Sequence, residues 1–297
     1  MNTLDVALKT TGVFIKTGPF VSLLKSRING LGHAIEQLYY APQISYNEEF
    51  ADFHLSIEFP NILRRWFRPQ ILFKNDGRTP FNPLPAEQLY PFFEWGLNWC
   101  IANHSNHFLI LHAAVVEKNG YAIVFPAAPG SGKSTLCAGL VSRGWRLLSD
   151  EMAIIEPETL SLVSVVRPIS LKNESIDVIK AFAPDFEFGS ITRDTAKGTV
   201  THIKAPIESL NREQEKAQPA CIVFPKYQAG AASLLKPVSK VKSVLRAAEE
   251  SFNYNVLGEK GFTMLCDLVD GSDCYEFVYS DLSDAVNIFN SLIPSKS

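Results

Sequence analysis

The stretch FPAAPGSGKSTL, residues 125–136, decides how the rest of this chain is interpreted. An apolar run at 121–125 precedes it, and a segment with helical character, 134–143, follows it. Within it, Ala127-x-x-x-x-Gly-Lys-Ser134 fits the P-loop pattern, with alanine in place of the first glycine. A chance glycine-rich turn that caps a helix is the alternative. The complete Gly-Lys-Ser-Thr and its flanking elements favour a phosphate-binding loop.

The P-loop pattern predicts a task for each position. Backbone N–H groups freed by the glycines would converge on phosphate oxygens at a helix N-terminus. Lys133 would contact the β and γ phosphates, and the Ser134 hydroxyl would join the shell of Mg²⁺. The residues expected to bind the nucleotide here are Pro129, Gly130, Ser131, Gly132, Lys133, Ser134 and Thr135.

An acidic pair, Asp150-Glu151, follows the predicted strand 145–149, sixteen positions after Ser134. Acids at the carboxyl end of a strand beside a P-loop are placed for Mg²⁺ coordination and base catalysis. Adjacent side chains on a strand face opposite ways, so both acids reach the phosphates only if the strand has ended or bulged. An exposed strand end without function is the alternative.

A histidine, His112, lies within the apolar run 108–116. Because only a short turn at 117–120 joins this run to 121–125, the two strands should form an antiparallel hairpin. A lone histidine on an apolar strand is often a core residue with satisfied hydrogen bonds. Its place beside the strand that leads into the P-loop keeps a catalytic role equally open.

The composition of the chain excludes several classes of function. The 297 residues carry a net charge of −3, so the chain lacks the excess of positive charge that is typical of nucleic-acid-binding proteins. No run approaches the 18 apolar residues of a membrane span, and the first residues do not form a signal peptide. Five scattered cysteines support neither a zinc ribbon nor a disulfide framework. We expect a reduced, cytoplasmic protein.

The pattern of elements predicts an α/β fold with a mixed β-sheet, in two parts. Residues 1–83 would form a small α/β region of unknown role, with strands at 12–16 and 53–58 and an interrupted helix at 20–40. Residues 84–297 would form the P-loop catalytic domain, entered through a helix at 84–104. Further strands are expected at 162–166, 199–204, 221–226 and 274–279, and helices at 172–182, 239–251 and 282–292.

Three segments together, Leu111-His-Ala113, the P-loop and 143–151, resemble the catalytic domain of HPr kinase/phosphorylase. The chain is similar to the bacterial group called HprK-related kinase A. Other blocks that carry the resemblance are 94–100, 167–172, 197–202, 223–227 and 253–254. The resemblance implies a fold related to phosphoenolpyruvate carboxykinase, with ATP and Mg²⁺ as cofactors and phosphoryl transfer to a hydroxyl.

The resemblance also implies roles. Asp150 would be the base and Glu151 a metal ligand with Ser134, or the two acids would be reversed, and His112 would orient or share a proton with them. One segment departs from the family: Thr195-Ala-Lys-Gly198 stands where HPr kinases have Glu-Ile-Arg-Gly. Lys197 could replace that arginine as a point charge on phosphate, unless the segment is a surface loop.

The expected function is therefore an ATP- and Mg²⁺-dependent kinase that acts on a hydroxyl of a peptide, protein or small molecule. HPr itself is not expected as the acceptor, because its docking segment is not found in the sequence. The alternative is an ATP-binding regulator with slow ATPase activity and no acceptor. The resemblance implies a PqqD-like carrier protein as a partner and homo-oligomer formation. The amino-terminal region would either dock the acceptor or cap the catalytic domain.

Overall fold

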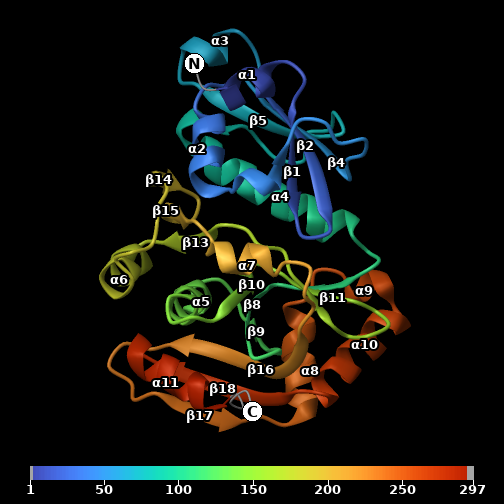
Figure 1. Cartoon of the computed structure of the whole chain (residues 1–297), viewed down its shortest axis with the longest axis vertical. Coiled ribbons are helices and arrows are strands. Elements are labelled where there is room, and N and C mark those ends of the chain that lie inside the picture. The colour runs from blue at the N-terminus through green and yellow to red at the C-terminus, as the bar shows by residue number, and fades with distance from the viewer. Residues whose placement is uncertain (1–2, 293–297) are drawn as a thin grey trace. The chain divides into compact units, whose positions relative to one another are not determined.

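The computed structural model describes residues 3–292 and is a mixed α/β protein (Figure 1). Its contacts divide the chain into two compact units. Unit 1 comprises Met1–Ile101 with Glu187–Lys204, and unit 2 comprises Ala102–Phe186 with Ala205–Ser297. The boundary expected between residues 83 and 84 thus falls inside unit 1. Within residues 3–292, no helix is both long and apolar enough to cross a bilayer.

Unit 1 is built on a six-stranded sheet in the order β3-β1-β2-β4-β5-β6. β2 and β4 run parallel, and the other neighbours are antiparallel. The strands are β1 (Val13–Thr17), β2 (Phe20–Ser26), β3 (Ile44–Ser45), β4 (Phe53–Glu58), β5 (Gln70–Asn75) and β6 (Leu84–Pro85). The unit also holds the helices α1 (Thr3–Lys9), α2 (Leu31–Leu38) and α3 (Leu63–Trp66), most of α4 (Leu89–His104), and the hairpin of β14 (Thr192–Thr195) and β15 (Gly198–Ile203).

The helix predicted at 20–40 is wrong in its first part. Residues 20–26 form β2, in which every second residue is buried, and the helix starts only after Gly30. Alternating burial is the period of a strand with one face on a core, and this tertiary requirement overrides helical spacing.

Helix α4 belongs to unit 1 because it packs on β5. The ring centroids of Phe92 and Phe73 lie 5.9 Å apart. A methyl group at Gly96 would meet the Phe73 ring at 2.1 Å, so only glycine allows this close approach. The helix expected to lead into the catalytic domain therefore closes the core of the amino-terminal unit.

Unit 2 is built on a sheet in the order β10-β8-β9-β16-β18-β17. The hairpin of β8 (Ala113–Lys118) and β9 (Tyr121–Pro126) is antiparallel, which confirms the prediction. β16 (Gln218–Tyr227) runs parallel to β9 and to β18 (Asp273–Tyr279). At the edges, β10 (Arg146–Ser149) pairs antiparallel with β8, and β17 (Leu234–Pro237) pairs antiparallel with β18. The sheet is therefore mixed, as expected.

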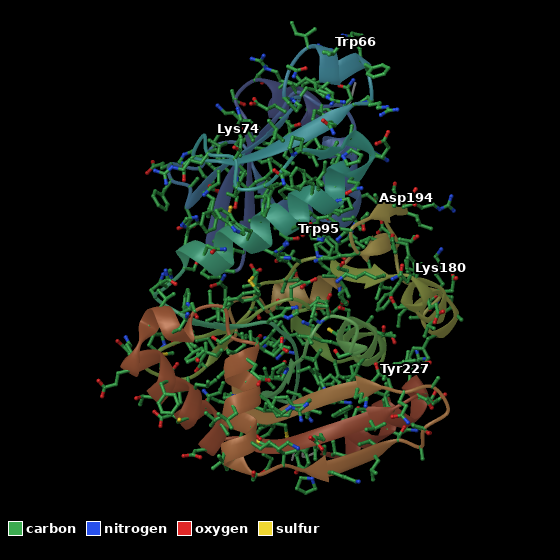
Figure 2. The ribbon with its side chains drawn as sticks, turned by 180° about the vertical axis from the view of Figure 1, so that it is seen from behind. Trp66, Lys74, Trp95, Lys180, Asp194 and Tyr227 are labelled. Atoms are coloured by element: carbon green, nitrogen blue, oxygen red, sulfur yellow. The ribbon has the colours of Figure 1, made fainter. Side chains whose placement is uncertain are left out.

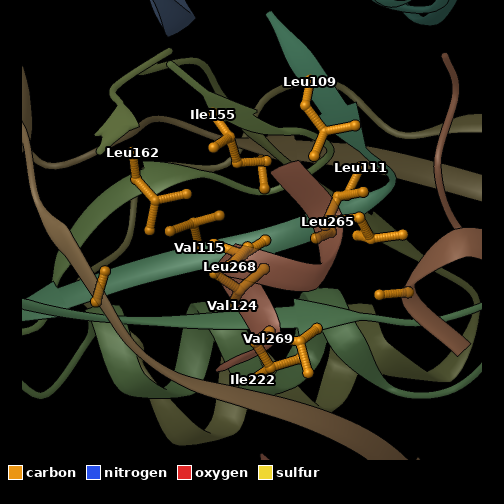
Figure 3. Packing of buried hydrophobic residues seen from close by; sticks show 14 of the residues in the cluster. Leu109, Leu111, Val115, Val124, Ile155, Leu162, Ile222, Leu265, Leu268 and Val269 are labelled. Carbon is orange, nitrogen blue, oxygen red and sulfur yellow. The ribbon is translucent and has the colours of Figure 1, made fainter. Parts of the chain in front are cut away.

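Both faces of this sheet are buried. On one face lie α5 (Lys133–Val141) and α11 (Leu282–Leu292), and the ring centroid of Phe289 in α11 lies 4.8 Å from that of Phe277 in β18. On the other face, α8 (Lys240–Glu249) and α10 (Glu259–Asp270) enclose an apolar cluster (Figure 3). This cluster includes Leu109, Leu111, Val115, Val124, Ile155, Leu162, Ile222, Leu265, Leu268 and Val269.

The remaining elements of unit 2 are short. β7 (Leu109–Leu111), β11 (Ala153–Ile155) and β12 (Leu162–Val163) form a small antiparallel sheet in the order β12-β11-β7. The others are β13 (Ile169–Lys172), α6 (Glu174–Phe182), α7 (Ile207–Asn211) and α9 (Tyr254–Leu257).

Candidate functional site

The glycine-rich loop 127–134 connects the end of β9 to the start of α5. Gly130 and Gly132 have φ values of 89° and 90°, a region that favours glycine. A methyl group at Gly132 would lie 2.5 Å from the Tyr279 hydroxyl oxygen, so glycine is also required sterically. Ala127, which replaces the first glycine of the pattern, is not among the residues with positive φ, so its methyl group is tolerated.

The loop is tied to the ends of two parallel strands. The Tyr279 hydroxyl of β18 donates a hydrogen bond to the carbonyl oxygen of Gly132, at 2.8 Å. The backbone N–H of Tyr227 in β16 donates to the carbonyl oxygen of Ser131, at 2.9 Å. Burial raises the pKa of Tyr279, so its hydroxyl keeps the proton that it donates. The loop conformation is thus set by the central sheet.

The other predicted loop residues divide by exposure. Pro129 and Gly130 are exposed, whereas Ser134 and Thr135 are half-buried in the first turn of α5. The side-chain oxygen of Ser131 is buried and has no hydrogen-bond partner within the described residues. The exposed backbone of the loop and the start of α5 together form the amino-terminal end of a helix, where an anion is favoured.

Lys133 is the most unusual residue of the loop. Its side chain is buried, and Nζ has no hydrogen-bond partner within residues 3–292. Burial lowers the pKa of Lys133, while the charges of Glu151 and Asp150 oppose that shift. A buried ammonium without a partner is costly, and an anionic ligand would remove that cost.

The acidic pair lies where the strand has ended. β10 stops at Ser149, whose hydroxyl oxygen accepts hydrogen bonds from the backbone N–H groups of Glu151 and Met152. This turn separates the directions of the two carboxylates: Asp150 is buried, while the side chain of Glu151 is 22% exposed. Both acids can face one site only if the strand has ended before them, and β10 does end before Asp150.

Asp150 is a buried carboxylate with a raised pKa. Its Oδ2 accepts a hydrogen bond from the backbone N–H of Ser170 at 3.0 Å, and its Oδ1 has no partner in the described part of the chain. Burial first, and then the charge of Glu151, raises the pKa of Asp150 to about 6, against the lowering effect of Lys133. A carboxylate with such a pKa suits proton transfer near neutral pH.

His112 occupies the break between two strands rather than the middle of one. β7 pairs with β11 in the small sheet and β8 pairs with β9 and β10 in the large one, so the chain changes sheets at His112. The predicted single strand 108–116 is corrected accordingly. At this break the imidazole faces acids on both sides: Nε2 lies 3.7 Å from Glu151, and Nδ1 lies 3.2 Å from Glu250.

Glu250 is a residue of the site that the sequence analysis does not predict. It stands at the end of α8, 138 positions from His112, and its backbone oxygen also accepts a hydrogen bond from the N–H of His112 at 2.7 Å. A carboxylate that holds one imidazole nitrogen fixes the tautomer and orientation of the ring. No spacing or motif signals this pairing, which depends on the packing of α8 near the start of β8.

Lys197 lies in unit 1, on the turn between β14 and β15. Its ammonium lies 5.0 Å from the centroid of the Trp95 ring, and its N–H donates to the Thr195 hydroxyl oxygen at 3.0 Å. Lys133, Asp150, Glu151 and His112 all belong to unit 2, whereas Lys197 belongs to unit 1. A contact between Lys197 and phosphate stays a prediction.

The donor set of the site determines which metal it could hold. Among residues 3–292, no group of three or more His, Cys, Asp or Glu side chains is arranged around a common metal position. Mg²⁺ is often held by one or two carboxylates, with phosphate oxygens and waters completing its shell. The partly exposed carboxylate of Glu151 and the half-buried Ser134 are compatible with such a shell.

No protein-family model matches the chain, and no curated protein matches it. Among the solved structures that it is similar to is the Hpr(Ser) kinase/phosphatase from Coxiella burnetii. The identity is 12%, the match covers 62% of this chain and 96% of that one, and the TM-score is 0.28. A TM-score this low does not establish a common fold, and the resemblance to HPr kinases remains a prediction.

Proposed function

We propose that the chain binds ATP with Mg²⁺ at the loop 127–134 and transfers the γ-phosphoryl group to a hydroxyl. The observation that carries this proposal is the buried ammonium of Lys133, which has no partner among the described residues. Beside it lies Asp150, a carboxylate with a raised pKa and with one oxygen that accepts no hydrogen bond from the described part of the chain. A bound triphosphate would supply the missing negative charge, and Asp150 would supply the base.

The binding part of the proposal uses the P-loop assignment. The backbone N–H groups of 130–134 and the ammonium of Lys133 would hold the phosphates. Ser134 and Glu151 are the proposed Mg²⁺ ligands. The metal, when bound, neutralises charge on the transferring group. The exposed backbone at Gly130, where an added methyl group would meet nothing within 4 Å, supports a loop kept open for a ligand.

The transfer part assigns the proton to Asp150. The acceptor hydroxyl oxygen forms a bond to the γ-phosphorus while the bond to the oxygen that bridges the β and γ phosphates breaks, and ADP leaves. The hydroxyl proton passes to Asp150, which is largely ionised above pH 6 because its pKa is about 6. Lys133 stabilises the charge on the phosphoryl oxygens. His112, which is oriented by Glu250, orients the carboxylate of Glu151.

The first test is ligand binding. Thermal unfolding with and without ATP and Mg²⁺ should show a rise in Tm for the wild type and none for Lys133→Met. Lys180→Met, which removes an exposed lysine of α6, is the matched control and should keep the rise. Equal responses of the wild type and Lys133→Met would refute the binding site.

The second test is transfer. Radiolabelled ATP is offered with hydroxyl-containing peptides, proteins and small molecules, including a PqqD-like carrier and any peptide that it binds. Label should reach an acceptor with the wild type and not with Asp150→Asn. ATP hydrolysis without any labelled acceptor would favour the alternative, a nucleotide-dependent regulator.

A further inference from the structure

The loop that carries α3 exposes large apolar side chains in unit 1. Ile62, Leu63, Trp66 and Phe67 are 82%, 69%, 77% and 61% exposed. Figure 2 places Trp66 on this loop, away from the strands of unit 1. Scattered single apolar residues on a surface are ordinary, but four within six positions form a patch that indicates an interaction. We name residues 62–68 the α3 tip.

The same tip is strongly cationic. It contains Arg64, Arg65 and Arg68, and the stretch 59–75 has no acidic residue. The nearest acids, Glu58 and Asp76, are paired with Lys74 and His54 instead. No carboxylate within the described residues pairs with the three arginines, so their charge is available to an external anion.

The arginines are held beside the rings of the tip. The Arg65 guanidinium lies 5.4 Å from the centroid of the Trp66 ring, and that of Arg68 lies 5.8 Å from the centroid of the Phe67 ring. Charged groups and aromatic rings therefore occupy one short segment. Aromatic rings at the level of lipid headgroups, with arginines beside anionic lipids, are the composition of an interfacial membrane anchor.

The size of the tip favours a lipid surface over a protein. A stable protein–protein interface buries roughly 800 Å² on each partner, over about 20 to 30 residues. The α3 tip comprises seven residues around a helix of four, Leu63–Trp66. A projection of this size is too small for a stable protein interface but suited to insertion between lipid headgroups.

We infer that the α3 tip docks the protein on an anionic lipid surface, with Trp66 and its apolar neighbours inserted and the three arginines on lipid phosphates or carboxylates. This binding site is separate from the loop 127–134 and does not depend on the proposed kinase activity. It would hold the protein on a membrane surface through a short exposed segment.

The test is co-sedimentation of the full chain with vesicles of phosphatidylcholine alone and of equimolar phosphatidylcholine and phosphatidylserine. The wild type should sediment with the anionic vesicles, and less so at high salt. Because each arginine at an anionic surface contributes about fivefold, Arg64→Gln/Arg65→Gln/Arg68→Gln should lower the partition coefficient roughly a hundredfold. Ile62→Ser/Trp66→Ser should abolish sedimentation. Val241→Ser/Leu245→Ser, which alters the exposed apolar pair of α8, should behave as the wild type.

Trp66 also gives a spectroscopic readout. It is the exposed tryptophan of the four, since Trp145 is buried and Trp95 and Trp99 are half-buried. Anionic vesicles should shift the emission of the wild type to the blue, and Trp66→Phe should lose the shift while it still sediments. All variants should keep the wild-type circular dichroism, because none of them changes a buried side chain.

Several results would overturn the inference. One is absence of sedimentation of the wild type, and another is equal sedimentation of the wild type and the tip variants. Equal binding to neutral and anionic vesicles would remove the role of the arginines. Binding to poly-glutamate without binding to vesicles would assign the tip to an acidic protein instead. A change of oligomeric state in the Trp66 variants would assign it to a second copy of this chain.

Discussion

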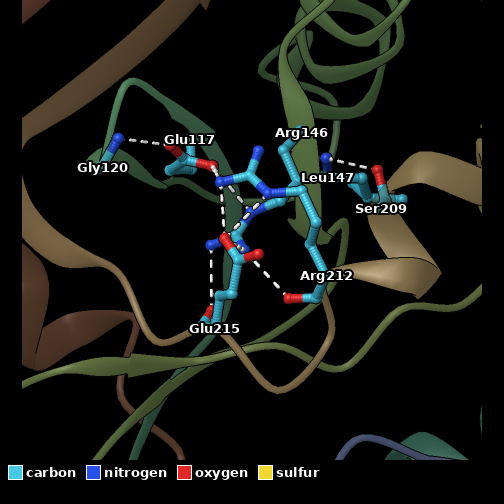
Figure 4. A network of polar contacts seen from close by, with 7 residues as sticks. All are labelled: Glu117, Gly120, Arg146, Leu147, Ser209, Arg212 and Glu215. Atoms are coloured by element: carbon cyan, nitrogen blue, oxygen red, sulfur yellow. Dashed lines mark hydrogen bonds and ion pairs between the residues drawn. The ribbon is translucent and has the colours of Figure 1, made fainter.

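The two ends of the β8–β10 pair carry buried charges in opposite conditions. At one end, Glu117 and Arg146 form an ion pair with 2.7 Å between Oε2 and Nε (Figure 4). Arg212 adds a second contact to the same carboxylate at 3.2 Å, and Arg146 also donates to the carbonyl oxygens of Arg212 and Glu215. At the other end, where β10 leaves the sheet, two buried atoms have no hydrogen-bond partner among the described residues: Oδ1 of Asp150 and Nζ of nearby Lys133.

The two ends differ in the role of their buried charges: one end stabilises the fold, and the other is suited to a ligand. A buried ion pair that is completed by further hydrogen bonds is self-sufficient, and its loss destabilises the fold. Buried charges without partners destabilise the ligand-free protein, so their presence indicates a ligand that completes them. Substitutions at the two ends should therefore have opposite effects on stability.

The largest effect is expected at Lys133. Lys133→Met should lower phosphoryl transfer by roughly a thousandfold, because it removes a charge that stabilises the transferring group. The same variant should raise the free energy of unfolding of the ligand-free protein by about 1–3 kcal/mol, since an unpaired buried ammonium is lost. Urea unfolding and labelled transfer measure the two effects. A Lys133→Met protein that is less stable than the wild type would contradict the contrast between the ends.

The paired end should respond in the opposite direction. Glu117→Ala leaves Arg146 buried without its main partner and should lower the free energy of unfolding by about 3–5 kcal/mol. Glu117→Met/Arg146→Met removes both charges and should recover most of that loss. Urea denaturation of the three proteins at neutral pH tests this. A double variant as unstable as the single one would show that packing, not charge, explains the effect.

Asp150→Asn should lower transfer by roughly a hundredfold or more, as expected for the loss of a general base. The rate of the wild type should rise with pH through an apparent pKa near 6, because Asp150 must be ionised to accept the proton. The measurement is a pH–rate profile at saturating ATP. A wild-type transfer rate that does not change between about pH 5 and about pH 8, the range around this pKa, would exclude Asp150 as the base.

Asp150 also predicts a dependence of stability on pH. Its pKa is raised from the ordinary 3.8 to about 6 in the folded protein, so folding favours the protonated form. The wild type should therefore lose stability as the pH rises from about 4 to about 6, by up to about 3 kcal/mol, relative to Asp150→Asn. Urea unfolding of the pair across this range tests the sign. A difference that does not change with pH would contradict the raised pKa.

A smaller effect is expected at Glu250. Glu250→Gln should lower kcat about tenfold, because the residue positions His112 rather than contacting substrate. The KM for ATP should not change. Glu249→Gln, which alters the exposed neighbouring acid on α8, is the matched control and should leave both constants unchanged. An equal effect of the two variants would remove the positioning role of Glu250.

The smallest effect is expected at Tyr279. Tyr279→Phe removes the hydrogen bond to the carbonyl oxygen of Gly132 and should cost about 1 kcal/mol, or about fivefold in the Kd for ATP. Tyr275→Phe, on the same strand, is the control and should bind ATP as the wild type does. Titration calorimetry measures both. An unchanged Kd in Tyr279→Phe would show that the strand ends do not set the loop conformation.

Much of unit 2 could be predicted because its signals are local. The hairpin of β8 and β9, the helix after the glycine-rich loop and the end of β10 before Asp150 each depend on a few consecutive residues. Strands β16 and β18 and helix α11 were also expected near their observed bounds. Unit 1 was predicted less well: residues 20–26 form a strand, and β5 and α1 were not expected. Its short elements depend on which neighbours they pair with, and the spacing of apolar residues does not reveal those neighbours.

By itself, the sequence determined the loop, the helix that follows it and the position of the two acids, since these depend on backbone preferences within about twenty residues. Only the tertiary structure decided that Lys133 is buried with no hydrogen-bond partner from residues 3–292, and that Glu250 lies against His112, 138 positions away. It also decided that residues 187–204 belong to the amino-terminal unit. The physical reason is that burial and long-range pairing arise when distant segments pack together, and no short stretch of sequence records which segments those are.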